Sequence, residues 1–197
     1  MTGGLLFLLA WLIQAVSAPQ PPQPIRCEFR AFDGADDVTR ETRVRVYPNG
    51  RKDGGVQTDS SGRIALTPGL YDVQMLRERD GQVKAIRWVE HLLVARYPDE
   101  GGRHLEVTNF RPQYGALELR APGAEYAAAA YAAGDRSRPV AGSTPGDGYL
   151  LLVVPAGRYD VRITPRSAGG TERWMTDVDI PADRTRLKTI APAKVPE

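Results

Sequence analysis

The sequence predicts an all-β protein built from two tandem antiparallel β-sandwich domains. Short runs of residues alternate between apolar and polar side chains, which is the pattern of half-buried strands. Turn signals rich in glycine, asparagine and aspartate separate these runs at short intervals, as they do in sandwiches and barrels. The chain also repeats itself, because TPGLYDVQM at 67–75 returns as VPAGRYDVRI at 154–163.

Residues 1–18 have the features of a secretory signal peptide. Residues 5–16 form an apolar run, and the small residues Ser17 and Ala18 follow it. The run is shorter than the roughly 20 apolar residues that a membrane-spanning helix needs. We therefore expect cleavage after Ser17 or Ala18, a secreted or periplasmic protein, and no membrane span after cleavage. No lysine or arginine precedes Leu5, so an uncleaved N-terminal anchor stays open as the alternative.

Residues 19–24, PQPPQP, predict an extended polyproline II linker. The first β-sandwich domain is expected at 25–111 and the second at 112–191, with a C-terminal tail at 192–197. The boundary between the domains falls in the proline-containing segment NFRPQYG, which separates two strand-like runs. Each domain then has a normal size for a small sandwich.

The first strand is expected to begin at Ile25. Ile25, Cys27 and Phe29 lie on one face of this strand, and charged residues alternate with them on the other face. Cys27 is the only cysteine, so the chain has no internal disulfide. An unpaired cysteine on an apolar strand face is expected to be a small buried hydrophobe.

An alignment of the two copies on Tyr71 and Tyr159 predicts the remaining elements. It also pairs three further positions: Gly62 with Gly148, Pro68 with Pro155, and Trp88 with Trp174. The segment RVRVYPNG at 43–50 aligns with AAAAYAAG at 127–134. A strand is therefore expected in the second segment, although alanine favours helix.

In each copy, a proline and a glycine form a turn just before the tyrosine. The tyrosine is expected to point into the core, with its hydroxyl bonded to backbone. The stretch VQTDSSGRIALTPGLYDVQM resembles the core of the carboxypeptidase regulatory-like family, a transthyretin-like (prealbumin-like) sandwich. STPGDGYLLLVVPAGRYDVRI resembles it too, and also resembles related PEGA-type modules. The resemblance implies immunoglobulin-like sandwiches and a non-catalytic accessory module, often on secreted or envelope proteins.

The charge pattern argues against nucleic acid as a partner. Lys and Arg number 26 against 24 Asp and Glu, which gives a formal net charge of +2. Basic and acidic residues interleave along the chain, whereas nucleic-acid binding needs a clustered basic face.

No set of catalytic residues is recognisable, so we predict that the chain is not an enzyme and has no cofactor. A hydrolase needs a nucleophile, a base and an orienting group. His91 is expected to be solvated, His104 follows a turn, and Ser143 is expected to be a turn residue. The C-terminal Tyr-Arg-Gly-Ser signature of transthyretin-like hydrolases is absent.

The sequence does not favour two further types of site. Asp33, Asp36 and Asp37 in FDGADD could offer oxygens to Ca²⁺, but they lack the regular ligand spacing of a dedicated loop, so no metal site is predicted. Asn109 stands near the end of a last strand, where an isopeptide crosslink would form. The expected first strand offers no lysine for it.

Trp88 and Trp174 are the obvious aromatic residues for a carbohydrate-binding platform. Their alternation with Leu92, Val94, Val178 and Ile180 predicts instead that both lie in the cores. The sequence thus favours a secreted or cell-envelope accessory module that binds or spaces partner proteins. A carbohydrate-binding β-sandwich module is the alternative, and no loop signature names the partner.

Overall fold

The computed structural model describes residues 22–95, 103–120, 125–166 and 171–190. These residues form sixteen strands and one short 3-10 helix, Thr39–Glu41. The expected signal peptide at 1–18 and the tail at 192–197 lie outside the described residues, as do residues 19–21 of the expected linker. Within the described ranges, no helix has the length and apolar character to cross a membrane.

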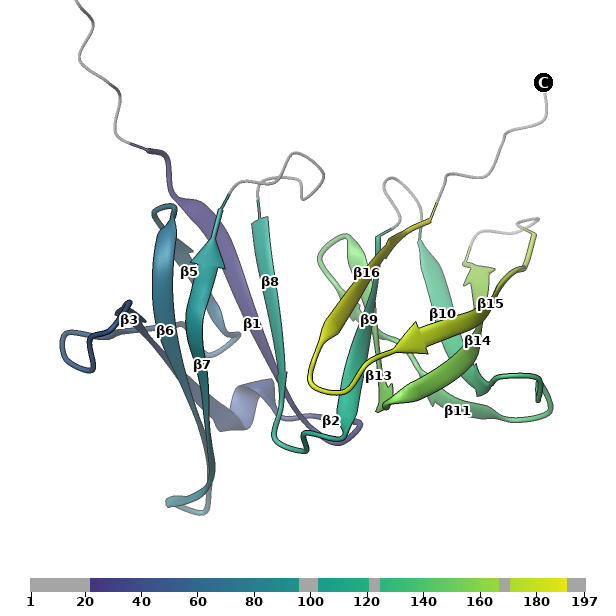
Figure 1. Ribbon diagram of the computed structural model, residues 1–197, viewed down its shortest axis with the longest axis horizontal. Coiled ribbons are helices and arrows are strands. Elements are labelled where there is room, and N and C mark those ends of the chain that lie inside the picture. Colours follow the sequence, from purple (N-terminus) through teal and green to yellow (C-terminus); the bar gives the residue numbers. More distant parts are fainter. Residues whose placement is uncertain (1–21, 96–102, 121–124, 167–170, 191–197) are drawn as a thin grey trace, which may run out of the picture.

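The first half of the chain folds into two facing sheets (Figure 1). One sheet contains β1 (Ile25–Asp33), β2 (Asp36–Asp37), β5 (Arg63–Leu66) and β8 (Arg103–Asn109). The other has the order β4-β3-β6-β7, with bounds β3 (Thr42–Pro48), β4 (Val56–Gln57), β6 (Gly69–Arg79) and β7 (Gln82–Val94). The last strand, β8, pairs with β1 in parallel, while the other pairings are antiparallel.

The second half repeats this arrangement. One sheet has the order β12-β13-β9-β16, with bounds β9 (Tyr114–Arg120), β12 (Thr144–Gly146), β13 (Tyr149–Pro155) and β16 (Thr185–Thr189). The other has the order β11-β10-β14-β15, with bounds β10 (Tyr126–Ala132), β11 (Pro139–Gly142), β14 (Gly157–Pro165) and β15 (Arg173–Ile180). The last strand, β16, again runs parallel to the first, β9. The predicted tandem β-sandwiches are confirmed, and so is the strand in the alanine-rich segment.

Each sandwich has its own apolar core, formed by the inward side of the alternating strands. Val73 and Met75 of β6 are fully buried, as is Val161 of β14. Burial of each such side chain contributes about 1.5–3 kcal/mol to folding. Cys27 is also buried in the first core, as predicted, and its burial raises the pKa of the thiol to about 11.

The repeated tyrosines form the same corner in both sandwiches. The hydroxyl of Tyr71 donates to the Thr67 carbonyl at 2.8 Å, and that of Tyr159 donates to the Pro155 carbonyl at 2.7 Å. Each bond spans the turn that precedes its strand. The predicted backbone partner is therefore confirmed in both copies.

A β-bulge after the tryptophan is repeated as well, and an aspartate holds it. His91 and Asp177 have left-handed backbone angles, with φ of 58° and 53°. Their backbone N–H groups donate to Asp72 at 3.0 Å and to Asp160 at 3.1 Å. These backbone bonds help to hold the pKa of both carboxyl groups below the usual range. The leading cause at Asp72 is the bond from His91, and at Asp160 it is the bond from Arg136.

The bulge corrects the prediction for the two tryptophans. An extra residue in one strand shifts the alternation of side chains between the two faces. Leu92 and Val178, which follow the bulge, point inward, whereas Trp88 and Trp174, which precede it, do not. Both tryptophans are half-buried and belong to neither core, so the prediction that they lie in the cores was wrong.

Candidate functional site

The two sandwiches meet through the outer faces of the β1–β8 sheet and the β9–β13 sheet. A third apolar cluster fills this junction. Its buried members are Phe32, Ala116, Tyr149, Leu151 and Val153, and its partly buried members are Leu105, Val107 and Tyr114. The outer face of a sheet is normally solvated in a lone sandwich, so this cluster joins the two sandwiches into one packed unit.

The strand β13 shows why this junction forms. Its sequence YLLLVVP does not alternate, and every residue before the proline is buried. Such a continuous apolar run is typical of a strand that is covered on both faces. Sequence reasoning missed the junction, although this run was the signal that could have revealed it.

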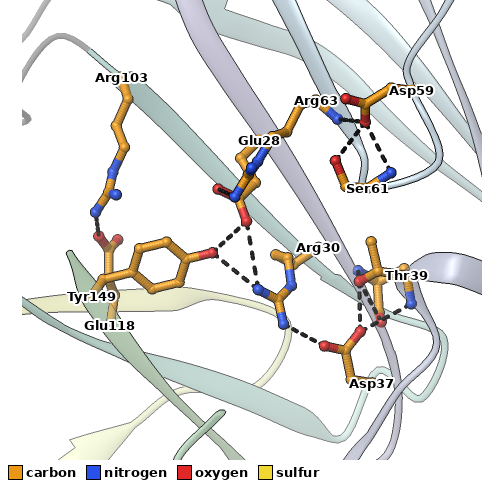
Figure 2. A network of polar contacts seen from close by, with 11 residues as sticks. Glu28, Arg30, Asp37, Thr39, Asp59, Ser61, Arg63, Arg103, Glu118 and Tyr149 are labelled. Atoms are coloured by element: carbon orange, nitrogen blue, oxygen red, sulfur yellow. Dashed lines mark hydrogen bonds and ion pairs between the residues drawn. The ribbon is translucent and has the colours of Figure 1, made fainter. Parts of the chain in front are cut away.

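A polar network surrounds the ring of Tyr149 (Figure 2). Its hydroxyl donates to Glu28 Oε1 at 2.7 Å and accepts a bond from Arg30 at 3.2 Å. Arg30 also pairs with Asp37, whose other oxygen accepts from the Thr39 hydroxyl. Burial, and then the bond to Glu28, raise the pKa of Tyr149 well above its usual range, so the phenol stays protonated and donates.

More arginines neutralise the carboxylates of the junction. Arg103 lies over the Tyr149 ring, 4.5 Å from its centroid, and reaches Glu118 at 4.0 Å. Arg120 donates to the same Glu118 carboxylate at 2.7 Å. Glu118 and Arg120 are 4% and 8% exposed. A buried carboxylate without such partners would strongly destabilise the fold.

Arg63 completes the network from the side of β5. It lies 3.5 Å from Glu28 Oε2. The turn before β5 sets its position, because Asp59 accepts backbone N–H bonds from Ser61 at 2.9 Å and from Arg63 at 2.8 Å. Figure 2 shows this turn beside the network.

A second polar contact lies at the end of β8. The Asn109 amide oxygen accepts N–H bonds from Gly34 at 3.0 Å and Arg111 at 2.8 Å, and its nitrogen donates to the Gly34 carbonyl at 2.7 Å. The side-chain amide of Asn109, which an isopeptide bond would use, therefore ties the β1–β2 turn to the segment between the sandwiches.

A third contact crosses the junction near β7. Arg87 of β7 pairs with Asp183 in the turn between β15 and β16.

Glu106 on β8 has an unusual pKa. Burial, and then the negative charge of Asp183, raise the pKa of Glu106 to about 7. This edge of the junction therefore carries an acid that titrates near neutral pH.

Two matching aromatic clusters lie on the sheets that face away from the junction. Trp88 is 5.7 Å from Tyr47 between ring centroids, with Lys52 Nζ 3.8 Å above the indole. Trp174 is 5.1 Å from Tyr131, with the Arg136 guanidinium 4.3 Å above it.

The bulge aspartates also hold the two cations of these clusters. Lys52 lies 3.8 Å from Asp72, and Arg136 donates to Asp160 at 3.0 Å. Each cluster therefore combines a half-exposed aromatic surface with a cation and a carboxylate. Such a set can stack on an apolar ring face and hydrogen-bond polar groups beside it.

The residues weighed for catalysis lie on separate elements. His91 is exposed at the β7 bulge, as expected, with Nδ1 2.6 Å from Asn49 Oδ1. His104 is the second residue of β8, where burial lowers its pKa, and its Nε2 has no hydrogen-bond partner within the described residues. The Ser143 hydroxyl accepts a hydrogen bond from the Ala128 N–H at 2.9 Å, so it contacts the backbone of β10.

The aspartates weighed for calcium are engaged by arginines. Asp33 pairs with Arg77 and, at 2.7 Å, with Arg111, while Asp37 pairs with Arg30. In the parts of the chain that the structure describes, no three His, Cys, Asp or Glu side chains are grouped to hold a metal.

The chain is similar to several solved structures at low sequence identity. No family model and no curated protein matches the chain. The chain is similar to the Bacillus anthracis TIE protein at 15% identity, over 84% of this chain and 33% of that one, with a TM-score of 0.30. It thus spans about a third of that chain's length.

Two other solved structures align over nearly their whole length. An adhesin candidate from Bacteroides ovatus ATCC 8483 shows 10% identity over 90% of this chain and 95% of that one, with a TM-score of 0.31. The C-terminal fragment of the pilus adhesin SpaC from Lactobacillus rhamnosus GG shows 10% identity over 88% of this chain and 100% of that one, with a TM-score of 0.27.

Proposed function

We propose that this chain is a non-catalytic accessory module, secreted or in the cell envelope, that holds two sandwiches at a fixed spacing and binds a partner protein. The observation that carries the proposal is the buried junction. Phe32, Tyr149 and Leu151 are 0%, 3% and 0% exposed between the sandwiches. Close-packed contacts of this kind are satisfied in one relative orientation, because dispersion and hydrogen bonding act only at short range.

We also propose that both sandwiches belong to the carboxypeptidase regulatory-like, transthyretin-like family. A corner of proline, glycine and tyrosine occurs in both copies, as Pro-Gly-x-Tyr at Tyr71 and as Pro-x-Gly-x-Tyr at Tyr159, and its hydroxyl bonds support this assignment. Modules of that family are accessory in character. The polar groups at the junction are consistent with such a role, since the carboxylates Glu28 and Glu118 are engaged by arginines.

Distance measurements test the spacing. Cysteines introduced at two exposed positions, Ser60→Cys and Lys188→Cys, would carry spin labels on opposite sandwiches. The native Cys27 is buried with a pKa of about 11, so labels attach selectively to the new thiols. We expect a single narrow distance distribution, which Leu151→Ala broadens. A broad distribution in the unmodified junction would contradict a spacing role.

Envelope experiments test the rest of the proposal. Intact mass of protein from the extracytoplasmic fraction should begin at Ala18 or Pro19, and retention of residues 5–16 would favour an anchor. Crosslinking in native envelopes should recover one defined protein. Turnover of a substrate that is lost in His91→Ala or His104→Ala would exclude a non-catalytic role.

A carbohydrate-binding module is the second candidate, and the position of the tryptophans favours it. Trp88 and Trp174 are half-buried on open sheet faces, each beside a cation and a carboxylate. A glycan array tests it. Micromolar binding that Trp88→Ala or Trp174→Ala abolishes would support this candidate over a protein partner.

A further inference from the structure

The β6–β7 and β14–β15 hairpins have apolar residues at the same inward-facing positions. The alignment on Tyr71 and Tyr159 pairs apolar residues throughout the core: Val73 with Val161, Met75 with Ile163, Val89 with Met175, Leu92 with Val178, and Val94 with Ile180. Both hairpins therefore bury the same pattern of apolar residues. A comparison with the second hairpin shows which residues of the first are not needed for packing the core.

Four of the outward-facing positions differ in polarity between the hairpins. The first hairpin has apolar residues where the second has polar ones: Leu70 for Arg158, Leu76 for Thr164, Ile86 for Glu172, and Leu93 for Asp179. The register is also the same, since Leu70 pairs with Leu93 across the strands just as Arg158 pairs with Asp179. The frame thus tolerates charged residues at these positions and does not require leucine. We name Leu70, Leu76, Ile86 and Leu93 the β6–β7 face.

This apolar character is exposed and concentrated on one sheet. Leu70, Ile86 and Leu93 are 47%, 58% and 50% exposed. Val56 and Val83, also highly exposed, belong to the same β4-β3-β6-β7 sheet. This sheet lies on the side of the first sandwich away from the junction (Figure 1). Grouped apolar residues on an open surface mark a contact site more often than a folding need.

The charged residues on this sheet indicate the sign of the charge that a partner would carry. One row across the sheet runs from Arg45 through Gln74 to Trp88, and the next runs from Arg43 through Leu76 to Ile86. Arg43 pairs with Glu78 across this face. In the described part of the chain, Arg45 has neither an ion pair nor a hydrogen-bonded side-chain partner, and its strand neighbours are neutral. The centre of the surface thus presents an uncompensated positive charge.

We propose that the β6–β7 face docks an acidic protein segment, whose apolar side chains cover Leu70, Leu93 and Ile86 and whose carboxylate meets Arg45. The inference rests on the proposed function as a partner-binding module and assigns its contact surface. A second copy of the chain fits less well, because a two-fold pairing of these faces brings the Arg45 side chains toward one another.

Binding of two defined peptides to the full chain tests this surface. One labelled peptide alternates valine and glutamate, and the other alternates valine and lysine. We expect the acidic peptide to bind at least about tenfold more tightly. The variant Leu70→Arg/Leu93→Asp copies the pair that the second sandwich already holds, so it should fold normally and weaken acidic-peptide binding about tenfold. Arg45→Glu should reverse the preference.

The matched control lies on the second sandwich. Arg158→Ala/Asp179→Ala should leave binding unchanged, and far-UV circular dichroism and urea midpoints confirm folding of every variant. Equal binding of both peptides, or no effect of Leu70→Arg/Leu93→Asp, would overturn the inference. So would a dimer in sedimentation equilibrium that this variant dissociates, since the occupant would then be a second copy. If envelope crosslinking recovers a protein only through the second sandwich, the proposed function stands and this assignment falls.

Discussion

The hydroxyl of Tyr149 lies 2.7 Å from a carboxylate oxygen of Glu28, and this hydrogen bond joins the second sandwich to the first (Figure 2). Tyr149 is 3% exposed and Glu28 is 7% exposed. The bond is charge-assisted and shielded from water, and Arg30 lies within 3.5 Å of both groups. The relative position of the sandwiches therefore depends on a small set of buried polar groups as well as on the apolar cluster.

Tyr149→Phe tests this dependence. The substitution keeps the ring but removes the closest donor to the Glu28 carboxylate, which then keeps only the arginine contacts at 3.5 Å, so we expect a loss of about 1–3 kcal/mol in urea unfolding. The spin-label distance distribution should broaden as well. Tyr126→Phe is the control, because Tyr126 is also buried but its hydroxyl has no hydrogen bond within the described residues. Equal effects of the two substitutions would mean that the bond to Glu28 contributes nothing specific.

The tyrosine corners give a second prediction. Tyr159 is 7% exposed in the second core, so Tyr159→Ala should reduce the free energy of unfolding by about 3–5 kcal/mol. Tyr71 is only half-buried, so Tyr71→Ala should have a smaller effect. Tyr159→Phe isolates the bond to Pro155 and should lose about 1 kcal/mol. A loss below about 1 kcal/mol for Tyr159→Ala would exclude this side chain from a stabilising role.

The repeat made the architecture predictable. The alternation around Tyr71 and Tyr159 identified the strands, and the alignment of 127–134 with 43–50 correctly overrode the helix propensity of alanine. Internal duplication carries this information because two segments with one fold must satisfy the same packing pattern. The lone cysteine was also placed correctly, since an uninterrupted alternation determines which strand face is buried.

The tryptophans and the junction were not predictable in the same way. The bulges at His91 and Asp177 depend on hydrogen bonds from a neighbouring strand, so simple alternation placed Trp88 and Trp174 on the wrong side. The junction depends on contacts between residues far apart in sequence, such as Glu28 and Tyr149. In the sequence, only the continuous apolar run of β13 indicated that the β12-β13-β9-β16 sheet is covered on both faces.

The bulge aspartates predict a loss of stability in acid. The folded pKa of Asp160 lies below its unfolded value of about 3.9, so the stabilisation is present above that pH and is lost as the pH falls through the folded pKa. Asp160→Asn should therefore lower the urea midpoint at pH 7 and bring the variant closer to the parent near pH 3. A constant difference between the two proteins at both pH values would contradict this linkage.

Glu106 predicts the opposite pH dependence. Its folded pKa of about 7 exceeds the ordinary value of 4.5, so the folded state holds a proton that the unfolded state releases. Stability from this group is full below about pH 4.5 and is lost as the pH rises to about 7. Glu106→Gln should raise stability at pH 8 by about 1–3 kcal/mol and have little effect at pH 4. Urea titrations at both pH values measure this, and a variant that is weaker at pH 8 would refute it.

The domain boundary gives the last prediction. We propose that 25–111 and 112–191 are separate domains, since each contains a complete sandwich core. Each fragment should therefore melt cooperatively and give dispersed amide signals. The second fragment would expose Leu151 and Val153, which the junction covers, so we expect it to associate with itself. Leu151→Lys should keep it monomeric. Mixing the two unmodified fragments should form a one-to-one complex that Tyr149→Phe weakens, because the junction bonds can re-form without the connecting chain. If neither fragment melts cooperatively, the junction is part of a single cooperative unit and the boundary does not separate domains.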